Sequence, residues 1–187
     1  MRPEHHTIVA LVEDRPGVLN RIASKWRQRG FNIESLAVGH SEMPGLSRMT
    51  FVVDAAQYDI EQVIKQCDKL IDIVHIEDLS GRDMVQRELM MVKVRATSAN
   101  RSELLQIADI FRANIVDVTS ESLIIEVTGD QEKLDSLLKL VDEFGVLELC
   151  RTGSIAMLRG AQKVGPEEEP TLILPDLEGG RAPGGLY

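Results

Sequence analysis

Short apolar runs alternate with stretches of helical spacing along the first 80 residues. Residues 7–12 form a mostly apolar run fit for a buried strand, and Val18, Ile22 and Trp26 then recur on one face of a helix. Gly30 is placed to end that helix. The remaining elements expected here are strands over 33–40, 46–53 and 73–79 and a helix over 60–71. The predicted order is therefore βαββαβ.

The same order recurs from residue 88 onward. Asn32-Ile33, after the first helix, corresponds to Asn114-Ile115, after the third, at a constant offset of 82 residues. The expected elements are strands over 89–96, 115–119 and 123–128, helices around 104–111 and between Asp130 and Gly145, and a closing strand over 146–158 that is long or bent at Gly153. Two such units in tandem predict an α+β protein of ferredoxin-like layout, with helices on one face of each antiparallel sheet.

The duplication divides the chain into four expected parts. These are a first unit over 1–80, a linker over 81–87, a second unit over 88–160 and a tail over 161–187. From Gly160 onward the chain holds four prolines and six glycines, so it buries too little apolar surface to offset its ordering entropy and is expected to be disordered. The alternative is that residues 171–174 dock on a partner and become ordered there.

The loop before the first helix has the features of a small anion site. Pro16 suits the entry to a helix, and Gly17 has no Cβ, so a ligand can approach the backbone closely. The first N–H groups of the helix lack intrahelical acceptors and lie at the positive end of its dipole. Asn32, at the head of the second strand, can both donate and accept. A carboxylate at the helix start and an ammonium near Asn32 or Asp14 would describe a free amino acid, but an ordinary tight turn explains the same residues.

The second unit does not repeat this loop. The offset places Ala99 at the position of Gly17, within Thr97-Ser98-Ala99-Asn100, which has neither proline nor glycine. The fold therefore does not require the Asp-x-Pro-Gly sequence. We expect the first unit to bind a small molecule and the second to serve as a contact surface.

Charge, cysteines and missing motifs narrow the function further. A net charge of −9 disfavours nucleic acid as the main partner. No apolar run approaches the roughly 20 residues of a membrane span, and the N-terminus has no signal-peptide core, so we expect a cytoplasmic protein.

Cys67 and Cys150 fall in apolar patterns and are interpreted as buried free thiols. The four histidines form no metal-ligand pattern, and no catalytic constellation is recognisable. We therefore expect neither an enzyme nor a metal site.

The size of each unit favours self-association. A unit of this size buries only about 60% of its unfolded surface, and exposed sheet edges invite pairing with another chain. A homodimer with sheets joined side by side would solve both problems. It would also place Asn32 of one subunit near the Gly17 loop of the other.

Several motifs together resemble those of a known family. They are Asp14-x-Pro16-Gly17-Val18-Leu19-x-Arg21, Arg29-Gly30-Phe31-Asn32-Ile33-Glu34-Ser35-Leu36, Leu46-Ser47-Arg48-Met49-Thr50, Arg87-Glu88-Leu89 and Phe111-Arg112-Ala113-Asn114-Ile115-Val116-Asp117-Val118-Thr119. With them, residues 6–160 resemble the small regulatory subunits of acetolactate synthase, also called acetohydroxyacid synthase. The second of these motifs is specific to that family rather than to ACT domains at large.

The resemblance implies an N-terminal ACT domain that dimerises, a second ACT-like domain, and a separate catalytic large subunit that carries thiamine diphosphate, FAD and Mg²⁺. This chain itself would bind none of these cofactors. It would activate the catalytic subunit, a transferase, and confer feedback inhibition by valine, or by leucine or isoleucine. A stand-alone amino-acid sensor acting on a different enzyme is the alternative.

The resemblance also implies where the effector binds, at the interface of two ACT domains. The corresponding positions are Asp14, Pro16, Gly17, Val18, Leu19, Asn32 and Ile33. The role of Asp14 has two interpretations, since its carboxylate can contact an ammonium group or repel a carboxylate.

Overall fold

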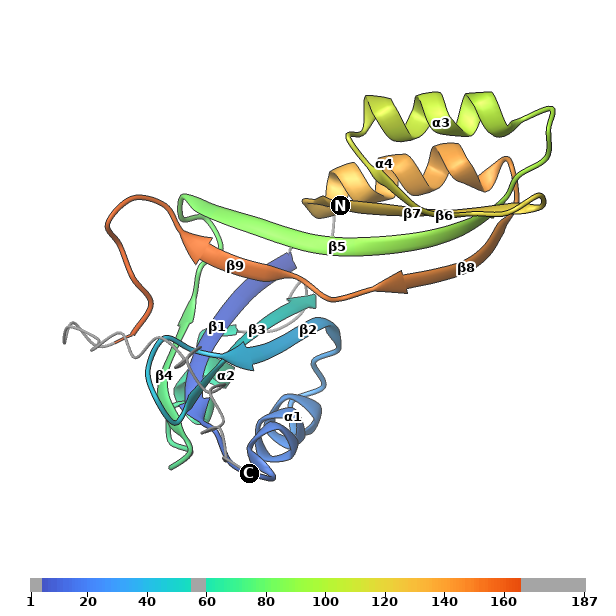
Figure 1. The fold of residues 1–187 in the computed structure, drawn as a ribbon. Coiled ribbons are helices and arrows are strands. Elements are labelled where there is room, and N and C mark those ends of the chain that lie inside the picture. The colour runs from blue at the N-terminus through green and yellow to red at the C-terminus, as the bar shows by residue number, and fades with distance from the viewer. Residues whose placement is uncertain (1–4, 55–59, 166–187) are drawn as a thin grey trace, which may run out of the picture.

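The computed structural model describes residues 5–54 and 60–165, and its elements form two successive βαββαβ units (Figure 1). The first unit comprises β1 (His5–Glu13), α1 (Val18–Gln28), β2 (Ile33–His40), β3 (Leu46–Asp54), α2 (Ile60–Cys67) and β4 (Ile73–Asp78). The second comprises β5 (Met84–Arg95), α3 (Arg101–Ile110), β6 (Asn114–Val118), β7 (Ser122–Gly129), α4 (Gln131–Asp142), β8 (Val146–Arg151) and β9 (Ile155–Leu158). The predicted α+β class with tandem ferredoxin-like units is confirmed.

The two sheets have the same strand order. It is β2-β3-β1-β4 in the first and β6-β7-β5-β8 in the second, with every neighbouring pair antiparallel. Each sheet packs one face against its own pair of helices, and each pair encloses a separate apolar cluster. The duplication seen in the sequence is therefore a duplication of topology as well.

Helix α1 shows how local sequence produces these elements. Val18, Ile22 and Trp26 are buried on one face, as the spacing predicts. The Trp26 ring meets Phe31 edge to face at 5.5 Å between centroids and stacks on Phe51 at 5.8 Å. The helix stops because Gly30 turns the chain with φ of 79°, a conformation that costs most other residues about 1–2 kcal/mol.

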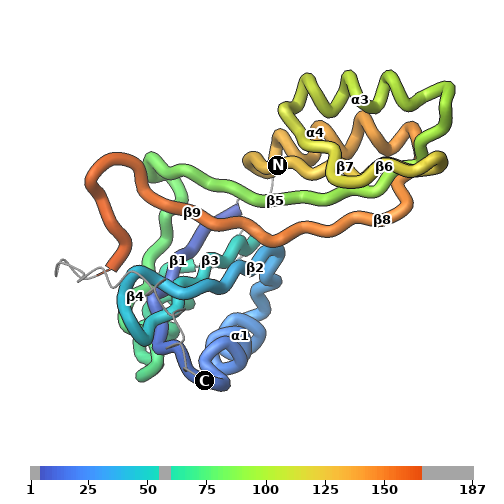
Figure 2. Tube along the Cα trace, viewed as in Figure 1, coloured from blue at the N-terminus to red at the C-terminus, as the bar shows by residue number. Residues whose placement is uncertain are grey.

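Strand β5 departs most from expectation. Residues 84–87, expected to be linker, form its first part and pair with β9, while residues 90–94 pair with β8. The Cα trace shows β5 running from the first unit into the second, beside β9 and β8 in turn (Figure 2). The closing strand is the bent alternative, because β8 and β9 are separated at Gly153, where φ is 85°. Because Arg87 and Glu88 are polar, the apolar pattern did not indicate that β5 begins as early as Met84.

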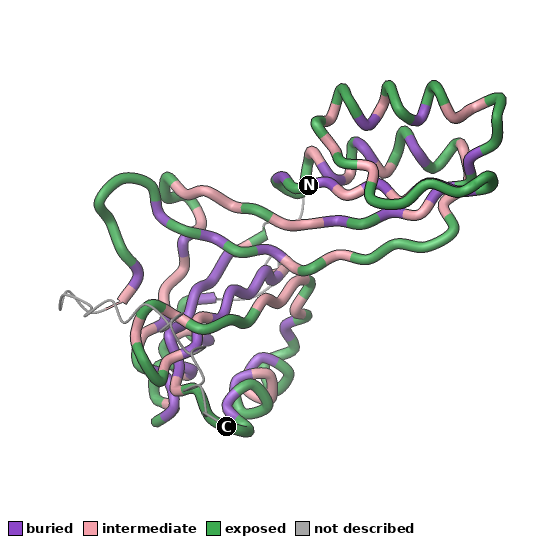
Figure 3. The backbone as a smooth tube through the Cα atoms, in the orientation of Figure 1, coloured by how far each residue is buried: buried purple, intermediate pink, exposed green. Residues whose placement is uncertain are grey.

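The outer faces of the two sheets differ in what covers them. On the first sheet, Val9 is fully buried against Leu79, Ala156, Leu158 and Val164. Both β1 and β9 accordingly contain buried residues (Figure 3). Val164 belongs to the stretch expected to be a disordered tail. Residues 166–187, which include the segment 171–174 given docking as its alternative, lie outside the described residues.

On the second sheet, the outer face is exposed. Met91 on β5 is paired in register with Cys150 on β8, so both side chains lie on the same face, and Met91 is 39% exposed. The prediction that both cysteines are buried is thus right for Cys67 and wrong for Cys150. Residues around Cys150 alternate between the two faces of the sheet. One face packs in the core, but no described residue covers the other face, where Cys150 lies.

Candidate functional site

The loop over 14–17 is a well-connected turn at the end of β1. The Asp14 N–H donates to the carbonyl of Gly45 at 2.9 Å, and the carbonyl of Gly17 accepts from Arg21 N–H at 3.1 Å, which starts α1. Gly17 has φ of 89°, and a Cβ built there meets nothing within 4 Å. Glycine is therefore required by backbone conformation, and the space where its side chain would lie is open to a ligand.

A buried carboxylate that the sequence did not point out fixes this loop. Asp72 is only 1% exposed and receives Arg15 Nε at 2.9 Å and Arg21 Nη1 at 2.5 Å. Its backbone carbonyl accepts from Glu13 N–H at 2.9 Å. The hydrogen bond from Arg15, reinforced by Arg21, lowers the pKa of Asp72 below its usual value despite burial. Both arginines are therefore occupied in holding the loop rather than free for a ligand carboxylate.

The other predicted side chains around the loop have different surroundings. Val18 is buried in the core with Ile22, so its side chain packs internally, whereas Leu19 is 39% exposed. Pro16 is exposed. The Asp14 carboxylate lies 3.2 Å from Nδ1 of His40, the last residue of β2. Backbone N–H groups, Asp14 and Leu19 remain the groups that a ligand can reach.

Asn32 and Ile33 lie at the opposite end of the same sheet. Ile33 pairs with Val53 on β3, whereas Glu13, just before the loop, pairs with Leu46. Leu46 and Val53 are seven positions apart along β3, which corresponds to roughly 20 Å. One chain therefore does not bring Asn32 together with the Gly17 loop, and the predicted residues form two half-sites.

Residues Ser35 and Leu36 of β2 contact the second unit. A Cβ at Gly153 would lie 2.5 Å from the carbonyl oxygen of Leu36, so only glycine allows this approach. Ser154 N–H donates to Ser35 Oγ at 2.7 Å, and Arg48 Nη2 donates to the carbonyl of Ala156 at 2.8 Å. The bend between β8 and β9 is thus fastened to β2, the strand that follows Asn32, and β9 is also held by Arg48 of β3.

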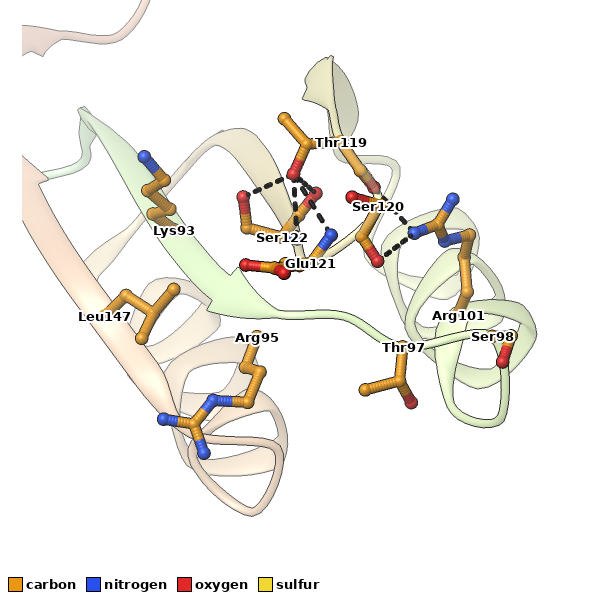
Figure 4. Close-up of a pocket in the computed structure, with 10 residues that line it drawn as sticks. All are labelled: Lys93, Arg95, Thr97, Ser98, Arg101, Thr119, Ser120, Glu121, Ser122 and Leu147. Carbon is orange, nitrogen blue, oxygen red and sulfur yellow. Dashed lines mark hydrogen bonds between the residues drawn. The ribbon is translucent and has the colours of Figure 1, made fainter.

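The largest of the described cavities, about 1180 Å³, lies elsewhere. It is in the second unit, where β5 leads into α3, and Figure 4 shows its lining side chains. This placement is unexpected, because the second unit was expected to act as a contact surface without a ligand loop. The signal available in the sequence was the pair of cations Lys93 and Arg95 on the open face of β5.

Two features are absent from the described residues. No cluster of three or more histidine, cysteine or acidic side chains is placed to hold a metal ion. No helix in the described part of the chain has the length and apolar character required to cross a membrane.

Comparison with known proteins identifies the family. Residues 8–75 match a model described as an AHAS small subunit-like ACT domain, and residues 87–160 match one described as the small subunit of acetolactate synthase. A probable acetolactate synthase small subunit from Methanothermobacter thermautotrophicus is 50% identical over 163 residues, which are 87% of this chain and 97% of that one. The chain belongs to the acetolactate synthase small-subunit family.

Relatives in bacteria extend the match to a solved structure. The acetolactate synthase small subunit of Mycobacterium bovis is 44% identical over 165 residues, covering 88% of this chain and 98% of its own. The crystal structure of the Thermotoga maritima small subunit superposes with a TM-score of 0.77 at 38% identity, over 84% of this chain and 98% of that one. Both units of this chain therefore belong to the shared fold.

Proposed function

We propose that this chain is the regulatory subunit of acetolactate synthase, which activates a separate catalytic subunit and makes it sensitive to valine or another branched-chain amino acid. Thiamine diphosphate, FAD and Mg²⁺ belong to the catalytic partner in this proposal. The observation that carries it is the family match across both units, which spans nearly the full length of the relatives. The open backbone at Gly17 supports a small ligand in the first unit.

The separation of the half-sites supports an effector site shared between two copies. Strand β2 lies at an edge of the first sheet, and edge strands present unpaired backbone groups to other chains. Two β2 strands related by a two-fold axis run antiparallel, so the Asn32 end of one faces the His40 end of the other. His40 contacts Asp14. This pairing would therefore bring Asn32 to the partner's loop.

The same geometry provides a route for coupling. Leu36, in the middle of β2, contacts Gly153 at the bend that leads into the second unit. A change at the shared site would therefore act on a strand that is also fastened to β8 and β9. By linkage, an effector preferred tenfold by the less active state shifts the equilibrium by about 1.4 kcal/mol.

Reconstitution with the catalytic subunit tests the proposal. Adding this chain should raise acetolactate formation, and valine should reverse the increase. Gly17→Asp or Asn32→His should abolish inhibition but leave activation largely intact. The matched controls are Gly81→Asp, another open glycine with positive φ, and Asn114→His, at the equivalent position of the second unit. If both test variants remain fully inhibited, the site is misplaced.

Two simpler measurements accompany the reconstitution. Failure to bind or activate any thiamine-diphosphate-dependent enzyme would instead favour a stand-alone amino-acid sensor. Calorimetry with valine, leucine and isoleucine identifies the effector, since one methylene changes binding by about 1–3 kcal/mol.

A further inference from the structure

The large cavity of the second unit is lined by an excess of positive charge. Lys93 and Arg95 come from β5, Arg101 is the first residue of α3, and Glu121 lies in the turn between β6 and β7 (Figure 4). Three cations against one carboxylate leave the lining with a charge of +2. This excess is local, because the chain as a whole carries −9.

Two of these cations have no partner among the described residues, unlike the arginines that hold the fold together. Arg151 bonds to both Glu88 and Asp135, at 2.6 and 2.8 Å. Lys93 and Arg95, in contrast, make no side-chain hydrogen bond or ion pair with any residue in the described ranges 5–54 and 60–165. Their charges are therefore available to a ligand.

Arg101 adds a donor that is buried and unsatisfied. Its Nη2 donates to the carbonyls of Thr119 at 2.6 Å and Ser120 at 3.0 Å, which fixes the guanidinium against the β6–β7 turn. Its Nε is buried and has no acceptor in the part of the chain that the structure describes. A buried charged donor without an acceptor is costly. Because this Nε is closed to solvent, an oxygen from outside the chain would reach it only after a shift of the Arg101 side chain.

The start of α3 is also left uncapped. The side chain of Asn100 turns back to accept from Thr97 N–H at 2.6 Å instead of capping the helix. The N-terminus of α3 therefore has no side-chain cap, although the acidic residue Glu103 lies in its first turn. It lies beside the same cavity, because Thr97 and Arg101 both line it.

We propose that this cavity binds a small multivalent anion carrying phosphate or carboxylate groups. Arginine and lysine side chains are the usual partners of both groups. The site would occupy the same end of the second unit that the Gly17 loop occupies in the first, since the 82-residue offset relates Thr97–Asn100 to residues 15–18. The two units would then bind ligands of different chemistry at equivalent places.

Calorimetric titration of the full chain alone, at constant ionic strength, tests this site. The probes are inorganic pyrophosphate and citrate, which separate phosphate from carboxylate recognition. The doubly substituted Lys93→Gln/Arg95→Gln chain should bind the preferred probe at least about tenfold more weakly, because two charge-assisted contacts are lost. Arg27→Gln/Lys69→Gln removes the same net charge from exposed positions of the first unit and should change binding less than about twofold.

Glu121 provides the sharper variant. If the cavity binds an anion, Glu121→Gln removes repulsion and should tighten binding several-fold. If the anion binds elsewhere on the chain, the same variant leaves its affinity unchanged, and this result would contradict the proposal. Absence of binding by either probe at millimolar concentration, or equal affinity in the Lys93→Gln/Arg95→Gln chain and its control, would overturn the proposal. Because no catalytic subunit or valine is present, the result is independent of the proposed regulation.

Discussion

The two units share strand order but differ at the outer face of the sheet and in the loop before the first helix. In the first unit the outer face is covered by β9 and by residues up to Val164, and a glycine with positive φ opens the loop. In the second unit the outer face is exposed, and hydroxyl and cationic side chains surround the loop. One topology thus supports two different surfaces, so the fold alone does not assign a role to either unit.

A charged residue introduced on each outer face should give the largest difference in unfolding free energy between the two units. Val9→Asp puts a carboxylate where Val9 is fully buried, and an uncompensated buried charge costs about 3–5 kcal/mol of unfolding free energy. Met91→Asp, on the exposed face, should cost less than about 1 kcal/mol. Urea unfolding followed by circular dichroism measures both. Equal losses would mean that the second face is covered in solution.

Substitution of Gly153, at the bend between β8 and β9, should lower stability more than substitution of another glycine of similar conformation. Gly153→Ala combines the penalty for a left-handed backbone with a clash against Leu36, for a total of about 2–4 kcal/mol. Gly145→Ala has similar φ, 91° against 85°, but open space around it, and should cost about 1–2 kcal/mol. Thermal and urea unfolding provide the comparison. If the two variants lose the same stability, the contact between Gly153 and β2 contributes little.

Asp72 should produce a smaller, pH-dependent difference between the units. Because its folded pKa is lowered by Arg15 and Arg21, ionised Asp72 stabilises the fold above its unfolded pKa of about 3.9, and this contribution disappears as the pH falls through the folded value. Asp72→Asn should therefore flatten the fall in unfolding free energy below about pH 4. Asp109→Asn, at an exposed position on α3, is the control. A wild-type slope in Asp72→Asn would contradict the assigned role.

Periodicity made most of the fold predictable, because helical spacing such as Val18, Ile22 and Trp26 directly reflects which face is buried. It could not reveal Asp72, a polar residue between two isoleucines, because the partners Arg15 and Arg21 are 57 and 51 residues away. Periodicity also could not show that Cys67 is buried whereas Cys150 is exposed. Alternation reports that a residue lies on a sheet face, and only the tertiary arrangement determines whether that face is covered.

The sequence suggested the candidate residues and an arrangement shared between two subunits, but not how far apart the two groups lie within one chain. The Asp-x-Pro-Gly loop and Asn32 follow one another closely in sequence, yet α1 carries the chain to the other end of the sheet before β2 begins. Strands β1 and β2 are both antiparallel to β3 and therefore parallel to each other, and this direction separates the two half-sites.

Mixing two inactive chains tests most directly whether the effector site needs two copies. Gly17→Asp and Asn32→His chains should each bind no valine as homodimers. After unfolding and refolding together in equal amounts, half the dimers are mixed, and each mixed dimer has one site built from an intact loop and an intact Asn32. Calorimetry should then recover about a quarter of the wild-type number of sites. No recovery, with mixed dimers present, would show that each chain binds valine on its own.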